Sequence, residues 1–224
     1  MPEFNVNGVV LDIPADRLSR NLEEALQSGK YEHGEAAALA AHLKPDDRFL
    51  DLGAGAGYLM VVAGRLGGTN PVAGVEAGPE MAEVARKTLS RNGVKGQVMW
   101  GAVVPDSHPG GAVPFRRRKA FWASSLAADG DDDTVTVDVP ALRLGDLLAQ
   151  HRPSVICVDI EGAELGLFGQ ALPADLRLVV MEIHPGQYGG AGVRRLFAGL
   201  GAAGFAYHPR GSRGAVVVFS RDDI

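Results

Sequence analysis

Short apolar runs alternate with amphipathic or alanine-rich segments along most of the chain. This alternation predicts a helix at 34–43 that is followed by strands and helices in turn. We expect strands at 48–52, 71–76, 97–104, 154–160 and 177–183, and helices at 56–66, 79–91, 141–150, 163–169 and 192–203. The run at 154–160 is almost continuously apolar, as in a strand that is covered on both faces. The pattern therefore indicates an α/β domain built around a mostly parallel sheet.

The first thirty residues are less regular than the rest of the chain. They contain one strand candidate at 9–13 and one helix candidate at 16–27, whose apolar positions share a face. We interpret residues 1–30 as a lead-in or lid segment and residues 31–224 as the domain itself.

Two later segments carry the pattern of a hairpin. Residues 105–138 interrupt the alternation with proline, glycine and a basic run, and they end in a strand candidate at 134–139. We interpret this segment as an insertion bearing a hairpin or loop, a feature that often carries substrate contacts on an α/β scaffold. Near the C-terminus, strand candidates at 205–208 and 215–219 predict an antiparallel hairpin that closes the sheet.

Composition narrows the class of protein. A chain of 224 residues with 46% hydrophobic and 22% charged residues suits one globular α/β domain. The net charge of −5 argues against nucleic acid as the main partner. No apolar run is long enough to span a bilayer, and the N-terminus has no basic segment followed by an apolar one, so we expect a cytoplasmic protein with no membrane partner. The single cysteine, Cys157, excludes an internal disulfide and is expected to be a buried thiol.

The sharpest local pattern is a glycine-rich loop at 51–58, which reads Asp-Leu-Gly-Ala-Gly-Ala-Gly-Tyr. It follows a predicted strand and precedes a predicted helix. Its glycines Gly53, Gly55 and Gly57 allow a tight turn against which a ligand can lie. Glu76 ends the next predicted strand, 23 residues after Gly53. A carboxylate at this position can accept hydrogen bonds from both hydroxyls of an adenosine ribose.

Three interpretations of this loop compete. The glycines can serve a structural turn alone, or the loop can bind a dinucleotide through a helix N-terminus that faces the pyrophosphate. The dinucleotide fingerprint is G-x-G-x-x-G, whereas this chain has G-x-G-x-G with Asp51 two residues before the first glycine. S-adenosylmethionine has no pyrophosphate but carries an α-ammonium group, for which Asp51 would supply a negative charge. The spacing therefore favours S-adenosylmethionine as the cofactor.

Several motifs in this order resemble the FkbM-type methyltransferase family. They are Tyr31-Glu32, the loop at 51–58, Val75-Glu76-Ala77, Ser124-Ser125-Leu126, the segment 158–164 (Val-Asp-Ile-Glu-Gly-Ala-Glu) and the segment 181–185 (Met-Glu-Ile-His-Pro). The Asp-Ile-Glu-Gly-Ala-Glu block is the most specific of them. The resemblance implies a Rossmann-like class I methyltransferase fold with a mostly parallel seven-stranded sheet whose last pair is reversed. It also implies S-adenosylmethionine-dependent methyl transfer, commonly to hydroxyl groups of sugars or natural products.

From the loop and the resemblance together we expect a set of residues to contact the cofactor. They are Tyr31, Glu32, Asp51, Gly53, Ala54, Gly55, Tyr58, Glu76, Ala77, Ala102, Ser124, Ser125 and Asp159.

The catalytic candidates follow two later strands. Ligands of open α/β sheets bind beyond the carboxyl ends of the strands, where Asp159, Glu161, Glu182 and His184 fall. Methyl transfer to a hydroxyl requires alignment of the acceptor and removal of its proton. His184 is a candidate for a neutral base, because the reference pKa of histidine is about 6.5. We predict Asp159, Glu161 and His184 as the catalytic residues, with Asp159 positioning the acceptor or the amino group of the cofactor.

Some alternatives stay open at this point. The acids and the histidine could also bind Mg²⁺, but no tight ligand spacing demands it, and we predict no metal site. Glu164 lies one helical turn after Glu161 and is expected to be a first-turn acid favoured by the helix dipole. The expected reaction is O-methylation of a small molecule, with an N-methyltransferase or a non-catalytic cofactor-binding module as alternatives. The basic run at 116–119 is either a solvated strand face or a site that recruits an anionic acceptor.

Overall fold

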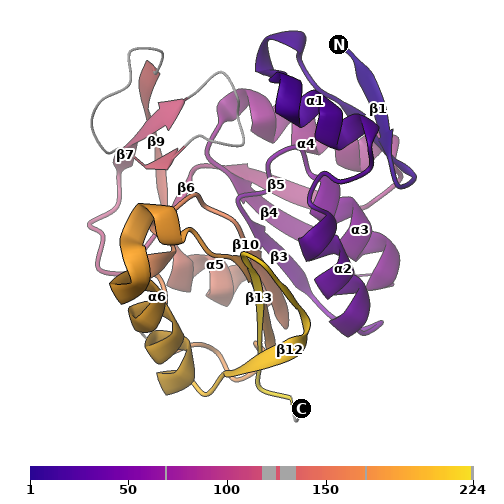
Figure 1. The fold of residues 1–224 in the computed structure, drawn as a ribbon. Coiled ribbons are helices and arrows are strands. Elements are labelled where there is room, and N and C mark those ends of the chain that lie inside the picture. Colours follow the sequence, from indigo (N-terminus) through magenta and orange to yellow (C-terminus); the bar gives the residue numbers. More distant parts are fainter. Residues whose placement is uncertain (69, 118–124, 127–134, 170, 223–224) are drawn as a thin grey trace.

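The protein is organised around a seven-stranded sheet in the order β12-β13-β11-β10-β3-β4-β5 (Figure 1). The computed structural model describes residues 1–68, 70–117, 125–126, 135–169 and 171–222. The strands of this sheet are β3 (Phe49–Leu52), β4 (Val72–Glu76), β5 (Gly96–Trp100), β10 (Val155–Val158), β11 (Leu178–Glu182), β12 (Ala206–Arg213) and β13 (Val216–Ser220). The first five are parallel, and β13 is antiparallel to both β11 and β12. This arrangement confirms the Rossmann-like sheet with a reversed C-terminal pair that the sequence predicted.

Helices cover both faces of the sheet and give three layers (Figure 1). One face is covered by α2 (His33–His42), α3 (Tyr58–Leu66) and α4 (Pro79–Arg91), and the other by α5 (Leu144–His151) and α6 (Pro185–Ala202). Within β10, Val155 and Cys157 belong to the first core, whereas Ile156 and Val158 belong to the second. Both faces are therefore buried, which explains the continuous apolar run, and Cys157 is a buried free thiol as predicted. In the described part of the chain, none of the helices has the length and apolarity that crossing a membrane requires.

The N-terminal segment packs on the α3–α4 side of this core. It contains a hairpin of β1 (Glu3–Val6) and β2 (Val9–Asp12), a short 3-10 helix (Ala15–Arg17) and α1 (Arg20–Gln27). Its buried side chains join the same apolar cluster as α3 and α4. The strand predicted at 9–13 is confirmed, whereas β1 was missed because only two of its four residues are apolar. The helix begins later than predicted because Ser19 caps it, its side chain accepting a hydrogen bond from the Leu22 amide. The division into a lead-in segment and a domain stays a prediction.

The single strand predicted at 97–104 is wrong, because Gly101 divides it. A Cβ atom at Gly101 would lie 2.7 Å from the carbonyl oxygen of Pro140, so only glycine fits this corner. The chain leaves the main sheet there and continues as β6 (Ala102–Val104), which pairs with β9 (Val135–Arg143). Strand β9 also pairs with β7 (Ala112–Arg117), and β7 with the short β8 (Ser125–Leu126), so the predicted insertion holds a small second sheet.

Two helix boundaries also differ from the prediction. Strand β9 continues to Arg143, so α5 begins at Leu144 rather than at residue 141. Helix α6 begins at Pro185 rather than at residue 192 and is interrupted at Gly189, which has a φ of 61°. Apolar periodicity did not predict the start of α6, because its first turns contain several glycines and few apolar residues.

A buried ion-pair network joins the amino ends of β3, β10 and β11, opposite the carboxyl ends. Arg177 donates from Nε to Oδ1 of Asp47 at 3.0 Å and from Nη2 to the other carboxylate oxygen. Asp47 also accepts hydrogen bonds from the Ser154 hydroxyl at 2.7 Å and from the Lys44 amide at 2.7 Å. Burial opposes the charge of Asp47, but the hydrogen bonds from Arg177 and Ser154 outweigh it, so the pKa of Asp47 lies below its ordinary value of 3.8.

Arg177→Met should lower the free energy of unfolding by about 3 kcal/mol at pH 7, because it leaves a buried carboxylate unpaired. Since the folded-state pKa of Asp47 is depressed, its contribution is present above pH 3.8 and is lost as the pH falls through the folded value. The gap between the two proteins in urea unfolding should therefore shrink in acid. The exposed pair of Arg20 and Glu24 provides the control, because Arg20→Met should cost less than about 0.5 kcal/mol. Equal effects of the two substitutions would contradict a structural role for the network.

Candidate active site

A cavity of about 610 Å³ lies at the carboxyl ends of the parallel strands. Its walls come from the loop after β3, the end of β4, the loop after β10, the end of β11 and the first turn of α2. Six acidic side chains line it, namely Glu32, Glu35, Glu76, Asp159, Glu161 and Glu182. The lysine and histidine side chains on the same walls are Lys30, His33 and His184. The cavity is therefore large enough for a cofactor-sized ligand and strongly acidic.

The cavity gathers most of the residues predicted from the sequence. The predicted residues in its walls are Tyr31, Glu32, Gly53, Gly55, Glu76, Ala77, Ala102, Asp159, Glu161 and His184. Asp51, Ala54 and Tyr58 are buried behind the glycine loop and are not among the lining residues. Ser124 lies outside the described residues, and Ser125 is placed in β8 by its backbone alone. The contacts that these residues would make with a cofactor stay predictions.

The glycines of the loop are required mainly by the packing of the protein on itself. Gly53 has a φ of 96°, and a Cβ atom there would lie 1.8 Å from the carbonyl oxygen of Asp159. Gly57 has a φ of 81°, and a Cβ atom there would lie 3.0 Å from the Cα of Ala85 in α4. Gly53 therefore holds the loops after β3 and β10 together, and Gly57 lets α3 approach α4. The sequence argument had explained these glycines by contact with a ligand.

Glu76 is fixed at the end of β4 by two backbone amides. Its Oε2 accepts a hydrogen bond from Gly55 at 2.8 Å, and its Oε1 accepts one from Gly78 at 2.6 Å. Burial raises the pKa of Glu76 to about 7, although both hydrogen bonds act in the opposite direction. Each carboxylate oxygen keeps a further lone pair, so Glu76 can still accept two hydrogen bonds from a ligand.

Glu32 lines the cavity and Asp51 is buried behind the glycine loop, and both lie near other acids. Burial, reinforced by the charges of Glu76 and Glu35, raises the pKa of Asp51 to about 8. Burial also raises the pKa of Glu32, whose Oε2 has neither solvent contact nor a hydrogen-bond partner. Both carboxyl groups would ionise more readily beside a cation, so this wall is chemically suited to a cationic ligand.

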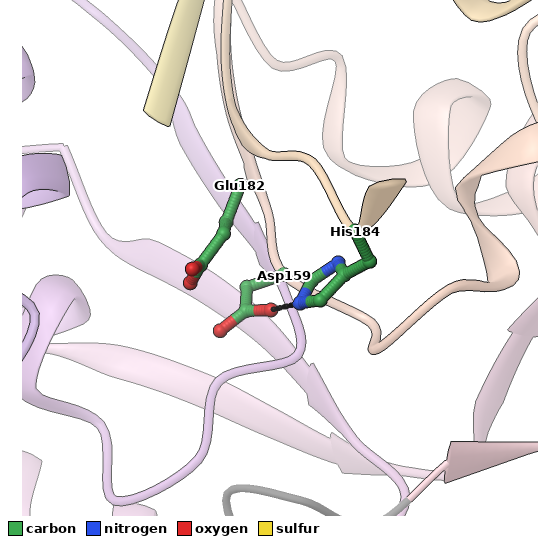
Figure 2. Close-up of side chains that lie close together, drawn as sticks. All are labelled: Asp159, Glu182 and His184. Atoms are coloured by element: carbon green, nitrogen blue, oxygen red, sulfur yellow. Dashed lines mark ion pairs between the residues drawn. The ribbon is translucent and has the colours of Figure 1, made fainter. Parts of the chain in front are cut away.

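His184 lies at the centre of a group of carboxylates at the ends of β10 and β11. Its Nδ1 is 3.0 Å from Oε1 of Glu164, which is fully buried and also accepts a hydrogen bond from the Gly162 amide at 3.1 Å. On the other side of the ring, Nε2 lies 3.5 Å from both Asp159 Oδ1 and Glu161 Oε2. Figure 2 shows Asp159, Glu182 and His184 converging, with the carboxylate of Asp159 directed at Nε2.

The carboxylates around His184 oppose the neutral form that a base at pH 7 would need. Burial favours the neutral ring, but the hydrogen bond to Glu164 and the charges of Glu164, Asp159 and Glu161 raise the pKa of His184 to about 9. These carboxylates therefore favour the protonated imidazole in the protein without ligands. Its Nδ1 hydrogen-bonds Glu164, and its Nε2 faces Asp159 and Glu161.

Two acids of the site were misjudged or missed from the sequence. Glu164 was expected to be a first-turn acid of a helix, but it lies in a 3-10 turn and hydrogen-bonds His184. Glu35 lies on α2, is 5% exposed and lines the cavity. Burial and the nearby Glu182 raise the pKa of Glu35 to about 7. The only signal in the sequence was a single acid among the alanines of an apolar helix.

Gly53→Ala should lower the free energy of unfolding by about 3 kcal/mol or more. The new methyl group would overlap the Asp159 carbonyl, and the alanine would have to adopt a positive φ. Urea unfolding measures the loss. Gly93 is a matched control, because it has a φ of 67° and no atom within 4 Å of its Cβ position. Gly93→Ala should therefore cost only the backbone strain of about 1 kcal/mol. A loss no larger at Gly53 than at Gly93 would show that the two loops are not in contact.

Comparison with known proteins identifies the family to which these motifs belong. The family model for the methyltransferase FkbM domain matches residues 51–207. Ribosomal protein L11 methyltransferase from Thermus thermophilus is 41% identical over 66 residues, which are 30% of this chain and 25% of that protein. The same enzyme from Burkholderia cenocepacia is 37% identical over 73 residues, or 33% of this chain and 23% of that protein. The matches thus span about a quarter of the length of these curated relatives.

Solved structures of methyltransferases resemble the chain at low identity. The ribosomal protein L11 methylase of Lactobacillus delbrueckii subsp. bulgaricus has a TM-score of 0.46 and 17% identity, over 84% of this chain and 74% of that one. The O-methyltransferase of Bacillus cereus in complex with SAH has a TM-score of 0.46 and 13% identity, over 92% of this chain and 84% of that one.

The resemblance inferred from the sequence motifs is confirmed by the family model, which covers the glycine loop, Glu76, the Asp159–Glu164 segment and His184. Since the match extends over more than half of the sequence, the chain belongs to the methyltransferase FkbM domain family.

Proposed function

We propose that the protein transfers the methyl group of S-adenosylmethionine to a hydroxyl group of a small molecule. The observation that carries this proposal is that one cavity joins the glycine loop and Glu76 to Asp159 and His184. A cofactor held by the glycine loop and Glu76 would therefore present its reactive group to Asp159 and His184. Proximity of this kind is the main requirement of a displacement reaction between two bound molecules.

The residues present suit S-adenosylmethionine. This cofactor, when bound, supplies a methyl group on a positively charged sulfur. Glu76 would accept hydrogen bonds from the ribose, and the backbone of Gly53 and Gly55 would lie against the cofactor. Asp159 would face its ammonium group, and the buried Asp51 would act on that group through its charge from behind the glycine loop. The buried Glu32 Oε2 and Asp159 Oδ1 have no hydrogen-bond partner, so a positively charged ligand would compensate groups that are otherwise costly to bury.

The acceptor would lie beside Asp159, because this residue is shared by the cofactor side and the histidine side of the cavity. The Asp159 carboxylate would accept a hydrogen bond from the acceptor hydroxyl and so direct its oxygen towards the methyl group. It would take the hydroxyl proton as the new O–C bond forms and the C–S bond of the cofactor breaks. His184, held by Glu164, would orient that carboxylate rather than act as a base. Alignment of the two reactants is a further contribution that these residues make to the barrier.

The acidic walls of the cavity limit the charge of the acceptor that can bind there. Six carboxylates line the cavity, and they favour a neutral or positively charged molecule over an anion. The basic run at 116–119, for which a solvated strand face and a site for an anionic acceptor were the alternatives, falls partly outside the described residues. An amine acceptor is the second candidate, because the same carboxylates would attract its charged form. A non-catalytic module with the same fold would bind the cofactor without any transfer.

Glu76→Ala should weaken S-adenosylmethionine binding by roughly 10- to 100-fold through the loss of charge-assisted hydrogen bonds. Calorimetric titration with S-adenosylmethionine, S-adenosylhomocysteine and NAD measures the effect and the identity of the cofactor. Glu83→Ala, on the exposed side of the neighbouring α4, is the control and should leave the affinity unchanged. Binding of NAD alone, or equal affinities in the Glu76 variant and the wild type, would refute the proposed cofactor site.

His184→Ala should reduce kcat for a hydroxyl acceptor by about 100-fold, because Asp159 would lose the group that orients it, with little change in the affinity for S-adenosylmethionine. Transfer of a labelled methyl group to panels of sugar, natural-product and amine acceptors measures both the acceptor and the effect. An N-methyltransferase would use amines and lose little activity in this variant. Cofactor binding without transfer to any acceptor would identify a non-catalytic module.

A further inference from the structure

We propose that Asp159, Glu182 and His184 form a binding site for a divalent cation. One potential ligand atom from each residue lies within 4.8 Å of the other two. Two ligands at about 2.1 Å from one ion are about 3 Å apart when adjacent and about 4 Å apart when opposite. The separation of 3.5 Å between Nε2 of His184 and Oδ1 of Asp159 is close to the adjacent spacing. Figure 2 shows the three side chains close together, with Asp159 directed at the imidazole of His184. Asp159 follows β10, whereas Glu182 ends β11 and His184 lies two residues later.

The environment of Asp159 favours a cation independently of the ligand spacing. Its Oδ1 has no contact with solvent and no hydrogen-bond partner, although it forms an ion pair of 3.5 Å with Nε2 of His184. A buried carboxylate oxygen without a hydrogen bond is costly, and the neighbouring Glu182 and Glu161 carboxylates increase the cost. A cation between Asp159 and Glu182 would remove this repulsion.

Glu164 provides the support that a metal-binding histidine requires. Ligating histidines almost always donate their other ring nitrogen to a carboxylate or carbonyl, which fixes the tautomer and the orientation of the ring. Glu164 is fully buried and holds Nδ1 of His184 at 3.0 Å, and it is itself fixed by the Gly162 amide. The pair leaves Nε2 as the nitrogen that faces Asp159.

The ligand set indicates the kind of ion. Two carboxylates and one imidazole suit a divalent cation that accepts both oxygen and nitrogen, for which Mn²⁺ is the natural probe. The protein supplies three ligands, and the remaining positions would be open to water and to the acceptor. A catalytic role for the ion rests on the proposed function: a cation here would polarise the acceptor hydroxyl and lower its pKa.

The site is tested by titrating Mn²⁺ into the full chain without cofactor and monitoring its binding by electron paramagnetic resonance. We expect one ion per chain and nitrogen coupling from His184. Asp159→Asn, Glu182→Gln and His184→Ala should each weaken binding by at least about tenfold, and Glu164→Gln by about 10- to 100-fold. Glu76→Gln removes a charge from the same cavity away from the cluster and should leave the affinity within about threefold.

The outcomes separate the cation site from the proposed function. Absence of Mn²⁺ binding, or equal binding in the wild type and the three ligand variants, would overturn the site. Stoichiometric displacement of Mn²⁺ by S-adenosylmethionine would also overturn it, because the carboxylates would then serve the cofactor itself. Thermal unfolding of each variant verifies that it is folded, and the nitrogen coupling reports ligation independently of affinity. Since Mn²⁺ binding and cofactor binding are measured separately, failure of one proposal leaves the other testable.

Discussion

The carbonyl oxygen of Asp159 lies so close to Gly53 that no side chain fits between the loops that follow β3 and β10. These two strands are neighbours at the centre of the sheet, and the chain leaves them in opposite directions. Open α/β sheets form their ligand crevice at such a switch point. The contact therefore sets the distance between the glycine loop and Asp159, and the shape of the cavity depends on it. The other walls, from β4, β11 and α2, are arranged around this fixed pair.

A second constraint is the number of carboxyl groups that share the cavity. Burial raises the pKa of Asp51, Glu32, Glu35 and Glu76, so the ligand-free protein holds several acids in an environment that disfavours their charge. A well-packed apolar wall would be more stable. Residues that reduce stability in this way are typical of sites that recover the loss on binding, since a ligand that binds only the folded state stabilises it.

Much of this arrangement follows from the sequence, because its main elements depend on local periodicity. The parallel strands, the helices between them and the glycine loop were predicted, and so was the convergence of Asp159, Glu161 and His184 at one edge. The corner at Gly101 was missed because its cause, the carbonyl of Pro140, lies far away in the chain. The same holds for the raised pKa of His184, which depends in part on Glu164 lying against its ring. Charge states and bends of the backbone depend on contacts between segments that are distant in the sequence. The periodicity of apolar residues carries no information about such contacts.

At Gly101 the chain passes from the main sheet to a small second sheet, and both sheets contribute walls to the cavity. Beyond this residue the chain enters the small sheet of β6, β7 and β9, and Ala102, Val103 and Phe115 of that sheet form one wall of the cavity. The walls with Glu76, Asp159 and His184 belong to the main sheet and its loops. Changes in the length or sequence of the small sheet would therefore reshape one wall of the cavity while the residues at the strand ends keep their positions. The fold thus separates the part of the cavity that can vary from the part that the packing of β3 against β10 fixes.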